Sequence, residues 1–465
     1  MKKIRIGSGA GYAGDRIEPA VELMEKGNLD YIIFECLAER TIAIGQQDKM
    51  KDPTKGYNQL LEARMRKILK LAKENHIKVI TNMGAANPVA AAEKTAEIAK
   101  ELGVSGLKIA YVTGDDITPQ IEQYYDNDVL ELDCKLGDIK DSILSTNVYL
   151  GAEGIIEALE NGADVVITGR VSDPALSIGP LVYEFGWNIK DDADKMGQAT
   201  LVGHLLECAG QVTGGYYADP GFKDVPDLDR LGFPLIEIDE TGHFTVSKVE
   251  GSGGLVCEDT CKEQMIYEIH NPEAYLTPDA IADFSHVTFT QQGKDIVAAA
   301  NATSHGKPET LKVSIGYRDC FIGEGEISYG GTNAMARAQL AADIIEKRLK
   351  LIGCDMEEFR VDYIGFNSLY KDKISSQYAP DVFPEIRLRV SGRTKDKENA
   401  TLIANEVEAL YTNGPAGGAG ATKKVSEVVS ICSIFVPRDI VDIQVSMTGR
   451  NHFINYHLLN LLGKF

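Results

Sequence analysis

Residues 4–19 read IRIGSGAGYAGDRIEP, and this stretch decides the class of fold. A short β-type run is followed by glycines at positions 7, 9, 11 and 14, and then, from Asp15, by the start of a helix. Glycines permit positive φ angles and leave backbone N–H groups open to a ligand, while the helix directs its positive end into the turn. The stretch therefore predicts a strand, an anion-binding turn and a helix.

The same order of elements recurs through the first half of the chain. Further apolar runs occupy residues 31–34, 79–81, 107–112 and 165–167, and the last three lead into the turns NMGAANP, TGDD and TGRVSDPA. Strands that alternate with helices indicate a parallel sheet covered by helices. Because turns at the carboxyl ends of such strands gather at one edge of the sheet, we expect these turns to face one crevice.

The pattern changes beyond about residue 285. Alternating strand-like segments at 286–290, 312–315, 385–390 and 440–445 are interrupted by helical segments at 333–349 and 400–411. We therefore predict an α/β fold in which residues 1–285 form a glycine-rich domain, with a mostly parallel sheet and helices on its faces. Residues 286–465 are expected to form an α+β domain with a mixed or antiparallel sheet. A Gly-, Pro- and Asp-rich stretch at 216–239 is expected to be a surface connection.

Composition excludes several classes of function. A chain of 465 residues suggests two or three domains, and its net charge of −21 argues against a nucleic-acid partner. The eight cysteines contain no C-x-x-C pair, so we expect reduced thiols and no zinc cluster or disulfide framework. No signal peptide or membrane span is apparent, which predicts a cytoplasmic protein with no membrane partner. Homo-oligomerisation is expected from base rates alone.

The first glycine turn matches G-x-G-x-x-G at residues 9–14, and Glu35 follows one βα unit later, as in a dinucleotide site. However, residues 15–19 are charged and contain a proline, where a dinucleotide fold needs an apolar helix. We prefer a contact to a phosphate, CoA or carboxylate group over a dinucleotide or a purely structural turn, both of which stay open. The candidate ligand-binding residues of this turn are Gly9, Gly11, Gly14 and Arg16, with Arg16 as a bidentate clamp.

Two later turns carry aspartates after predicted strands. In TGRVSDPA, Arg170 is a candidate second anion contact, while Asp173 either caps the next helix or acts as a general base or metal ligand. In TGDD, Asp115 and Asp116 could hold Mg²⁺, or one could cap a helix while the other is solvated.

Two histidines are candidates for acid–base chemistry. His204 shares a helix face with Glu207 and Cys208, which suits either a buried, hydrogen-bonded histidine or a proton-transfer group. His305 lies in the polar turn NATSHGKP and is a second candidate.

Other glycine-rich turns resemble the first in composition. Loops this flexible suit closure around an anionic substrate, although a surface loop without a ligand is the alternative. Their candidate substrate-binding residues are Asn82 and Gly84, Gly330 and Gly331, and Gly417 and Gly418.

Four of these motifs, GSGAGYAGDR, TNMGAANP, VVITGRVSDPA and GPAGGAG, together resemble the acyclic terpene utilisation (AtuA-like) family, formerly a domain of unknown function. The similarity extends over nearly the whole chain. It implies a role in bacterial catabolism of branched acids, in settings where CoA thioesters are carboxylated, hydrated and cleaved. The resemblance itself assigns no catalytic residue.

The leading hypothesis is a catabolic lyase or hydratase that acts on a small branched carboxylate or its CoA thioester. Its anionic substrate would be held by the glycine-rich loops, and its proton would be moved by Asp173 or His204. The cofactor is unknown; we expect no redox cofactor, while a divalent metal stays open. The alternatives are a nucleotide- or dinucleotide-dependent enzyme and a non-catalytic subunit of a carboxylase or lyase complex.

Overall fold

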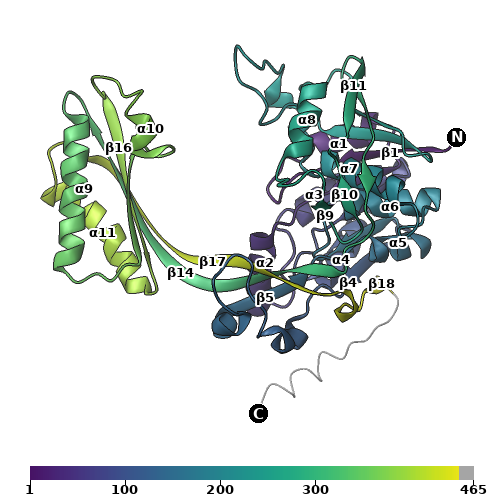
Figure 1. The fold of residues 1–465 in the computed structure, drawn as a ribbon, viewed down its shortest axis with the longest axis horizontal. Coiled ribbons are helices and arrows are strands. Elements are labelled where there is room, and N and C mark those ends of the chain that lie inside the picture. Colours follow the sequence, from purple (N-terminus) through teal and green to yellow (C-terminus); the bar gives the residue numbers. More distant parts are fainter. Residues whose placement is uncertain (450–465) are drawn as a thin grey trace. The chain divides into compact units, whose positions relative to one another are not determined.

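The computed structural model describes residues 1–449, which form two compact units (Figure 1). The first unit contains Met1–Gly316 and the described residues from Ile431 onward, and the second contains Tyr317–Ser430. The boundary at residue 285 expected from the sequence falls within the first unit, because strands on both sides of it belong to one sheet. No helix among residues 1–449 is long and apolar enough to cross a membrane.

A ten-stranded sheet forms the centre of the first unit. Its five central strands are parallel, in the order β1 (Lys3–Ser8), β2 (Tyr31–Phe34), β3 (Lys78–Thr81), β6 (Val165–Thr168) and β4 (Ile109–Thr113). Every residue of β2 and β6 is buried, as expected for parallel strands covered on both faces. The predicted α/β class with a parallel sheet is confirmed.

Antiparallel strands extend both edges of this parallel core. On one edge lie β7 (Pro234–Asp239), β8 (Phe244–Lys248), β12 (Ile296–Ala300) and β11 (Thr288–Gly293), and on the other lies β18 (Gln444–Met447). Strand β7 belongs to the stretch expected to be a surface connection. Its apolar Ile236 and Ile238 are fully buried where β7 pairs with β1, so the end of that stretch is part of the core.

Two groups of helices cover the sheet. Helices α1 (Glu18–Lys26), α3 (Leu61–Glu74) and α4 (Pro88–Glu101) share one core cluster with Ile32, Val79 and Val165. The neighbouring strand residue Tyr31 points the other way, where its hydroxyl donates to Glu184 of α6 (Ala175–Phe185) at 2.6 Å. Helix α6 packs with α5 (Glu153–Glu160) and α7 (Ala193–Glu207). The helices thus form a layer on each face.

The order of the strands explains why the connecting helices lie on both faces of the sheet. The chain crosses the sheet from β1 through β2 and β3 to β4, and then turns back to place β6 between β3 and β4. Because parallel crossovers are right-handed, this reversal moves the connecting helices to the opposite face. The chain therefore leaves adjacent strands β3 and β6 towards opposite faces, which opens a crevice at their carboxyl ends.

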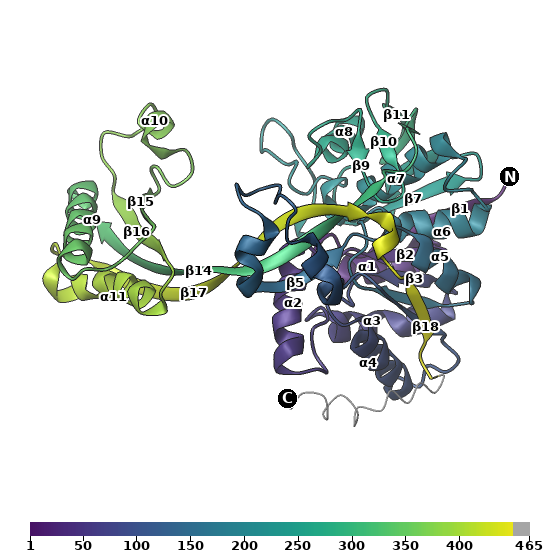
Figure 2. The same cartoon turned by 60° about the horizontal axis from the view of Figure 1, so that its bottom comes forward.

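The first unit contains further helices and strands. They are α2 (Glu39–Lys51), α8 (Glu258–Ile266), a small sheet of β9 (Tyr275–Leu276), β10 (Ile281–Asp283) and β13 (Thr303–Ser304), and β5 (Ile143–Val148), which pairs with β14 (Thr310–Gly330) (Figure 2).

The second unit has a β-α-β-β-α-β order typical of ferredoxin-like folds. The strands lie in the order β15 (Glu358–Ile364), β16 (Glu385–Thr394), β14 and β17 (Ala419–Pro437). Helices α9 (Ala334–Leu351) and α11 (Lys397–Asn413) bury a separate core that includes Leu388 and Val407, and α10 (Lys371–Ser375) lies between β15 and β16 in the chain. This unit is α+β, as its strand pattern predicts.

Candidate active site

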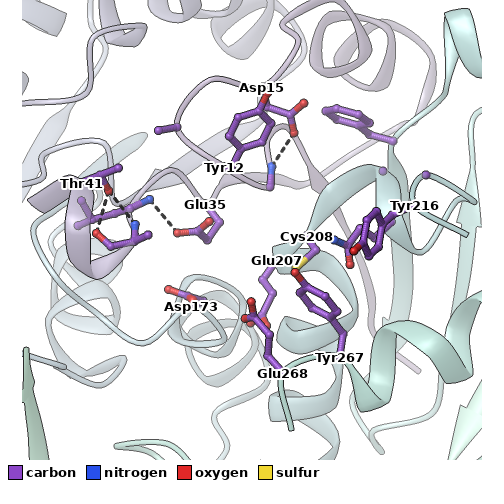
Figure 3. Close-up of a pocket in the computed structure, with 18 of the residues that line it drawn as sticks. Tyr12, Asp15, Glu35, Thr41, Asp173, Glu207, Cys208, Tyr216, Tyr267 and Glu268 are labelled. Carbon is purple, nitrogen blue, oxygen red and sulfur yellow. Dashed lines mark hydrogen bonds between the residues drawn. The ribbon is translucent and has the colours of Figure 1, made fainter. Parts of the chain in front are cut away.

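A cavity of about 820 Å³ opens at the carboxyl ends of the parallel strands of the first unit. It is lined by the glycine turn after β1, by the residues that follow β2 and β6, and by the C-terminal end of α7. Figure 3 shows the carboxylates of Glu35, Asp173, Glu207 and Glu268 facing this common space. Four separate segments therefore bring acidic side chains to one cavity.

Arg170 provides the positive charge behind this carboxylate cluster. Its side chain is 1% exposed, and its guanidinium forms an ion pair with Asp173 and donates to the carbonyls of Leu37 and Val171. The ring of Tyr149 lies 4.4 Å from the guanidinium carbon, and the Tyr149 hydroxyl donates to Glu39. The hydrogen bonds, the ion pair and the cation–π contact with Tyr149 together hold the Arg170 guanidinium in one orientation.

Asp173 combines burial with access to the cavity. Its side chain is 35% exposed, and it lines the cavity beside Arg170. Burial raises the pKa of Asp173 well above its usual value, and the nearby Glu35 and Glu207 add to this effect, whereas Arg170 opposes it. A carboxyl group with a raised pKa in a cavity is suited to carry a proton.

Glu35 is held by the turn that follows β3. Its Oε1 accepts hydrogen bonds from Leu37 N–H at 2.8 Å and from Asn82 Nδ2 at 3.0 Å. Burial raises the pKa of Glu35, although Arg170 and these hydrogen bonds act in the opposite direction. Asn82, predicted to bind substrate, is fully buried and contacts Glu35 in this structure.

His204 lies behind Glu207 and is 1% exposed. Its Nδ1 is 2.7 Å from Glu207 Oε1, and its Nε2 is 3.0 Å from the carbonyl oxygen of Met265. Burial lowers the pKa of His204, but the charge of Glu207 and the hydrogen bonds outweigh it, so that the pKa is raised. Burial also raises the pKa of the adjacent Cys208 thiol, which makes it a poor nucleophile.

A second chamber of about 530 Å³ shares Tyr149, Asp173, Glu207 and Glu268 with the first cavity. Its other walls include the apolar Leu276, Pro278, Ile281, Leu311 and Phe435 and the charged Glu309 and Lys312. The carboxylate cluster thus lies at the wall that the two cavities share.

The first glycine turn is closed by the protein's own side chains. The Asp15 carboxylate accepts from the N–H of Gly11 at 2.9 Å and of Arg16 at 2.8 Å, and helix α1 begins only at Glu18. A Cβ on Gly9 would lie 2.4 Å from the Phe34 ring, so that glycine permits close packing.

Within the same turn, a Cβ on Gly11 would collide with the backbone of Cys208, whereas Gly14 is exposed. Arg16 lines the cavity, and its guanidinium donates to the carbonyl oxygens of Leu228 and Asp229 at 3.2 and 3.4 Å.

The two aspartates of TGDD have different surroundings. Asp115 is buried and accepts hydrogen bonds from Asn147 Nδ2 at 2.8 Å and from Arg170 N–H at 3.0 Å, and burial raises its pKa to about 6. Asp116 is exposed and accepts from Thr118 N–H. Within residues 1–449, no group of three or more His, Cys, Asp or Glu side chains is arranged to hold a metal ion.

The remaining candidates lie apart from the cavity lining. Gly84 allows the turn after β3 to approach the turn after β6, because a Cβ there would lie 2.4 Å from the Thr168 oxygen. The His305 side chain is 59% exposed, and its Nε2 lies 3.6 Å from Asp283 Oδ2. Gly330, Gly331, Gly417 and Gly418 belong to the second unit, where Arg337 donates to the carbonyls of Gly330 and Ala416.

Several residues of the site were missed by the sequence analysis. Tyr149, Glu39 and Glu268 belong to no motif, and Glu268 has a φ of 60°, which is uncommon for a glutamate. The buried Arg64 donates to the carbonyls of Ala13 and Asp15 and so supports the glycine turn. Tyr149 directly follows the buried strand β5, as Glu35 follows β2, and this position is the signal that could have found it.

A model of one protein family matches residues 4–447, nearly the whole chain, and is described as "Acyclic terpene utilisation family protein AtuA". A comparison with curated proteins gives no match.

Proposed function

The chain belongs to the acyclic terpene utilisation family, and from this premise we propose that it is a lyase or hydratase acting on a small branched carboxylate or its CoA thioester. The family has a catabolic role in the use of acyclic terpenes. In the hydration direction, a carboxylic acid of the site delivers a proton to the α-carbon of an α,β-unsaturated acyl group, the oxygen of water bonds to the β-carbon, and the proton that the water loses returns to the carboxylate and regenerates the acid. The reverse reaction removes the hydroxyl from the β-carbon and the proton from the α-carbon.

The observation that carries the proposal is Asp173 at the cavity, paired with the fixed Arg170. Its raised pKa makes Asp173 easier to protonate than an ordinary aspartate, so that it can deliver a proton to the α-carbon and take it back in the reverse direction. Arg170 remains positive beside it and stabilises negative charge that develops on the acyl oxygen. His204 has both ring nitrogens engaged, so the proton-transfer role goes to Asp173 alone.

The carboxylate or thioester end of the substrate is assigned to Arg16. This residue is exposed at the lining of the cavity, and two carbonyl contacts orient its guanidinium. The N–H groups of Gly11 and Arg16 already bind Asp15, so the guanidinium, rather than the turn, is the anion contact in this proposal.

The test is the Asp173→Asn variant, assayed with branched α,β-unsaturated acids, their 3-hydroxy counterparts and the CoA thioesters of both. We expect kcat to fall by about 10²- to 10⁴-fold, the usual contribution of general acid–base catalysis. Asp116→Asn, a change at an exposed aspartate outside the cavity lining, is the matched control and should retain activity. Full turnover by folded Asp173→Asn protein would exclude this mechanism.

A further inference from the structure

Two residues that line the second chamber, Glu207 and Ser172, each carry a buried polar atom with no hydrogen-bond partner among residues 1–449. The atoms are Glu207 Oε2 and Ser172 Oγ, and the residues are 7% and 5% exposed. Buried polar groups are nearly always paired, because an unpaired group loses its hydration without compensation. Both atoms therefore mark a place where a ligand can supply hydrogen bonds.

The partner of Glu207 must be a hydrogen-bond donor. Its other oxygen faces His204 Nδ1, and the second ring nitrogen of His204 faces the Met265 carbonyl oxygen. With an acceptor at each nitrogen, a doubly protonated imidazole donates from both, and Glu207 Oε1 accepts from Nδ1–H. A carboxylate has only acceptor sites, so Oε2 requires a donor.

The walls around these two atoms define the rest of the ligand. Leu276, Pro278, Ile281, Leu311 and Phe435 give the chamber apolar walls, while Glu39, Glu309 and Lys312 also reach its lining. The tilted rings of Tyr275 and Phe284 lie 5.2 and 6.0 Å from the His204 ring, which keeps this side of the histidine in apolar contact. The portion of the ligand that fills this chamber is therefore a hydrocarbon chain with few polar groups.

We propose that the second chamber is a binding site for a hydroxyl group carried on an aliphatic chain, with Glu207 and Ser172 as its partners. A hydroxyl donates to Glu207 and accepts from Ser172, and it adds no charge. A ligand carboxylate cannot donate to Glu207, and an ammonium, which could donate to both atoms, would bring a charge into a chamber with apolar walls. The substrate class is therefore an aliphatic hydroxy acid or its thioester. This inference deepens the proposed function and rests on it, since a hydratase adds or removes such a hydroxyl.

Binding of a matched series of acids tests the site without relying on turnover. The series is 5-methylhexanoate, its 2-hydroxy and 3-hydroxy derivatives and its 3-amino derivative, measured by calorimetry. We expect one hydroxy isomer to bind the wild-type protein at least about tenfold more tightly than the parent acid, as for a hydrogen bond to a buried charged group. Three results would overturn the proposal: tightest binding of the 3-amino derivative, equal binding of the hydroxy acids and the parent acid, or no binding of any of the four acids.

Variants connect this preference to the two named residues. Glu207→Gln keeps an acceptor for His204 but replaces one carboxylate oxygen by an amide donor, and Ser172→Ala removes the hydroxyl. Each should reduce the preference for the hydroxy acid to within about twofold. Glu309→Gln, at an exposed glutamate of the same chamber, is the control and should leave it unchanged. Tenfold preference in folded Glu207→Gln and Ser172→Ala proteins would contradict the assignment.

Failure of the proposed reaction gives a different pattern. If Asp173→Asn retains full activity while hydroxyl preference depends on Glu207, the mechanism is wrong and the binding site stands. If Asp173→Asn is inactive while the preference does not depend on Glu207 or Ser172, the binding site is wrong and the mechanism stands.

Discussion

At the scale of single residues, buried acidic groups help to place the turns beside the cavity. Asp115 is one example, because its carboxylate holds the backbone N–H of Arg170 and so helps to place the turn after β6. Its raised pKa of about 6 means that the folded protein binds this proton more tightly than the unfolded chain does.

Asp115→Asn should therefore change how stability depends on pH. The proton on Asp115 favours the folded state, and this contribution is full below about pH 4, the ordinary pKa of the carboxyl, and is lost as pH rises through about 6. The stability of the wild-type protein relative to Asp115→Asn should fall by roughly 2 kcal/mol between pH 4 and 7. Urea unfolding at both pH values measures this, with Asp141→Asn, at an exposed aspartate, as control. A constant difference would show that burial does not perturb Asp115.

Arg16→Ala should separate substrate binding from chemistry. The guanidinium is exposed and makes no ion pair among the described residues, so its loss should leave the fold intact. We expect KM to rise about tenfold with little change in kcat, because the contact is equal in the ground and transition states. Arg230→Ala, at an exposed arginine outside the cavity lining, is the control. A fall in kcat alone would place Arg16 in the chemical step.

At the scale of elements, the first glycine turn is a packing device. Gly11 lies against the end of α7, where an added Cβ would be 2.4 Å from the carbonyl carbon of Cys208. This contact links the turn after β1 to the segment that presents Glu207. The glycine is needed there because two backbones approach closely, whatever ligand the cavity binds.

Gly11→Ala is expected to destabilise the protein by about 1–3 kcal/mol, the usual cost of a steric conflict in a packed region. Gly14→Ala is the matched control in the same turn. Its Cβ would meet only the side chain of Tyr12, 3.1 Å away and 61% exposed, so the cost should stay within about 0.5 kcal/mol. Chemical unfolding compares the two. Equal stabilities would show that the turn and α7 can move apart freely.

At the scale of the whole molecule, each unit has its own hydrophobic core. Met65 belongs to the cluster of the first unit and Leu388 to that of the second, and both are fully buried. Separate cores make separate unfolding steps the expectation for this chain.

The single tryptophan makes that expectation measurable. Trp187 lies in the first unit and is 5% exposed, so its fluorescence reports the unfolding of that unit, whereas circular dichroism reports both. Leu388→Ala should remove about 2–5 kcal/mol from the second unit and leave the fluorescence midpoint unchanged. Met65→Ala should lower the fluorescence midpoint. Parallel shifts in both signals for both variants would indicate one cooperative unit.

The sequence predicted the parts of the fold that depend on local pattern. The β-branched runs, the turns at their ends and the parallel core all follow from residues close together in the chain. Strand β7 was missed because its alternation is short and its partner, β1, is more than two hundred residues away in the chain. The assignment of 286–316 to the first unit depends on similarly distant pairing.

The site was only partly predictable for the same reason. Arg170, Asp173 and Arg16 line the cavity, as do Glu207 and Glu35, which the sequence analysis noted for other reasons. Glu268 could not be found, because its relevance depends on which loops meet in space. The roles assigned to all of these residues stay predictions.

The cluster of carboxylates has a kinetic consequence. A protein of net charge −21 whose cavity is lined by Glu207 and Glu268 repels an incoming anion, so the association of a carboxylate ligand is slowed at low ionic strength. Added salt shortens the range of this repulsion to about 10 Å at 0.1 M. Association of a carboxylate should therefore accelerate with salt, in contrast to electrostatically steered enzymes, while association of its neutral amide should not.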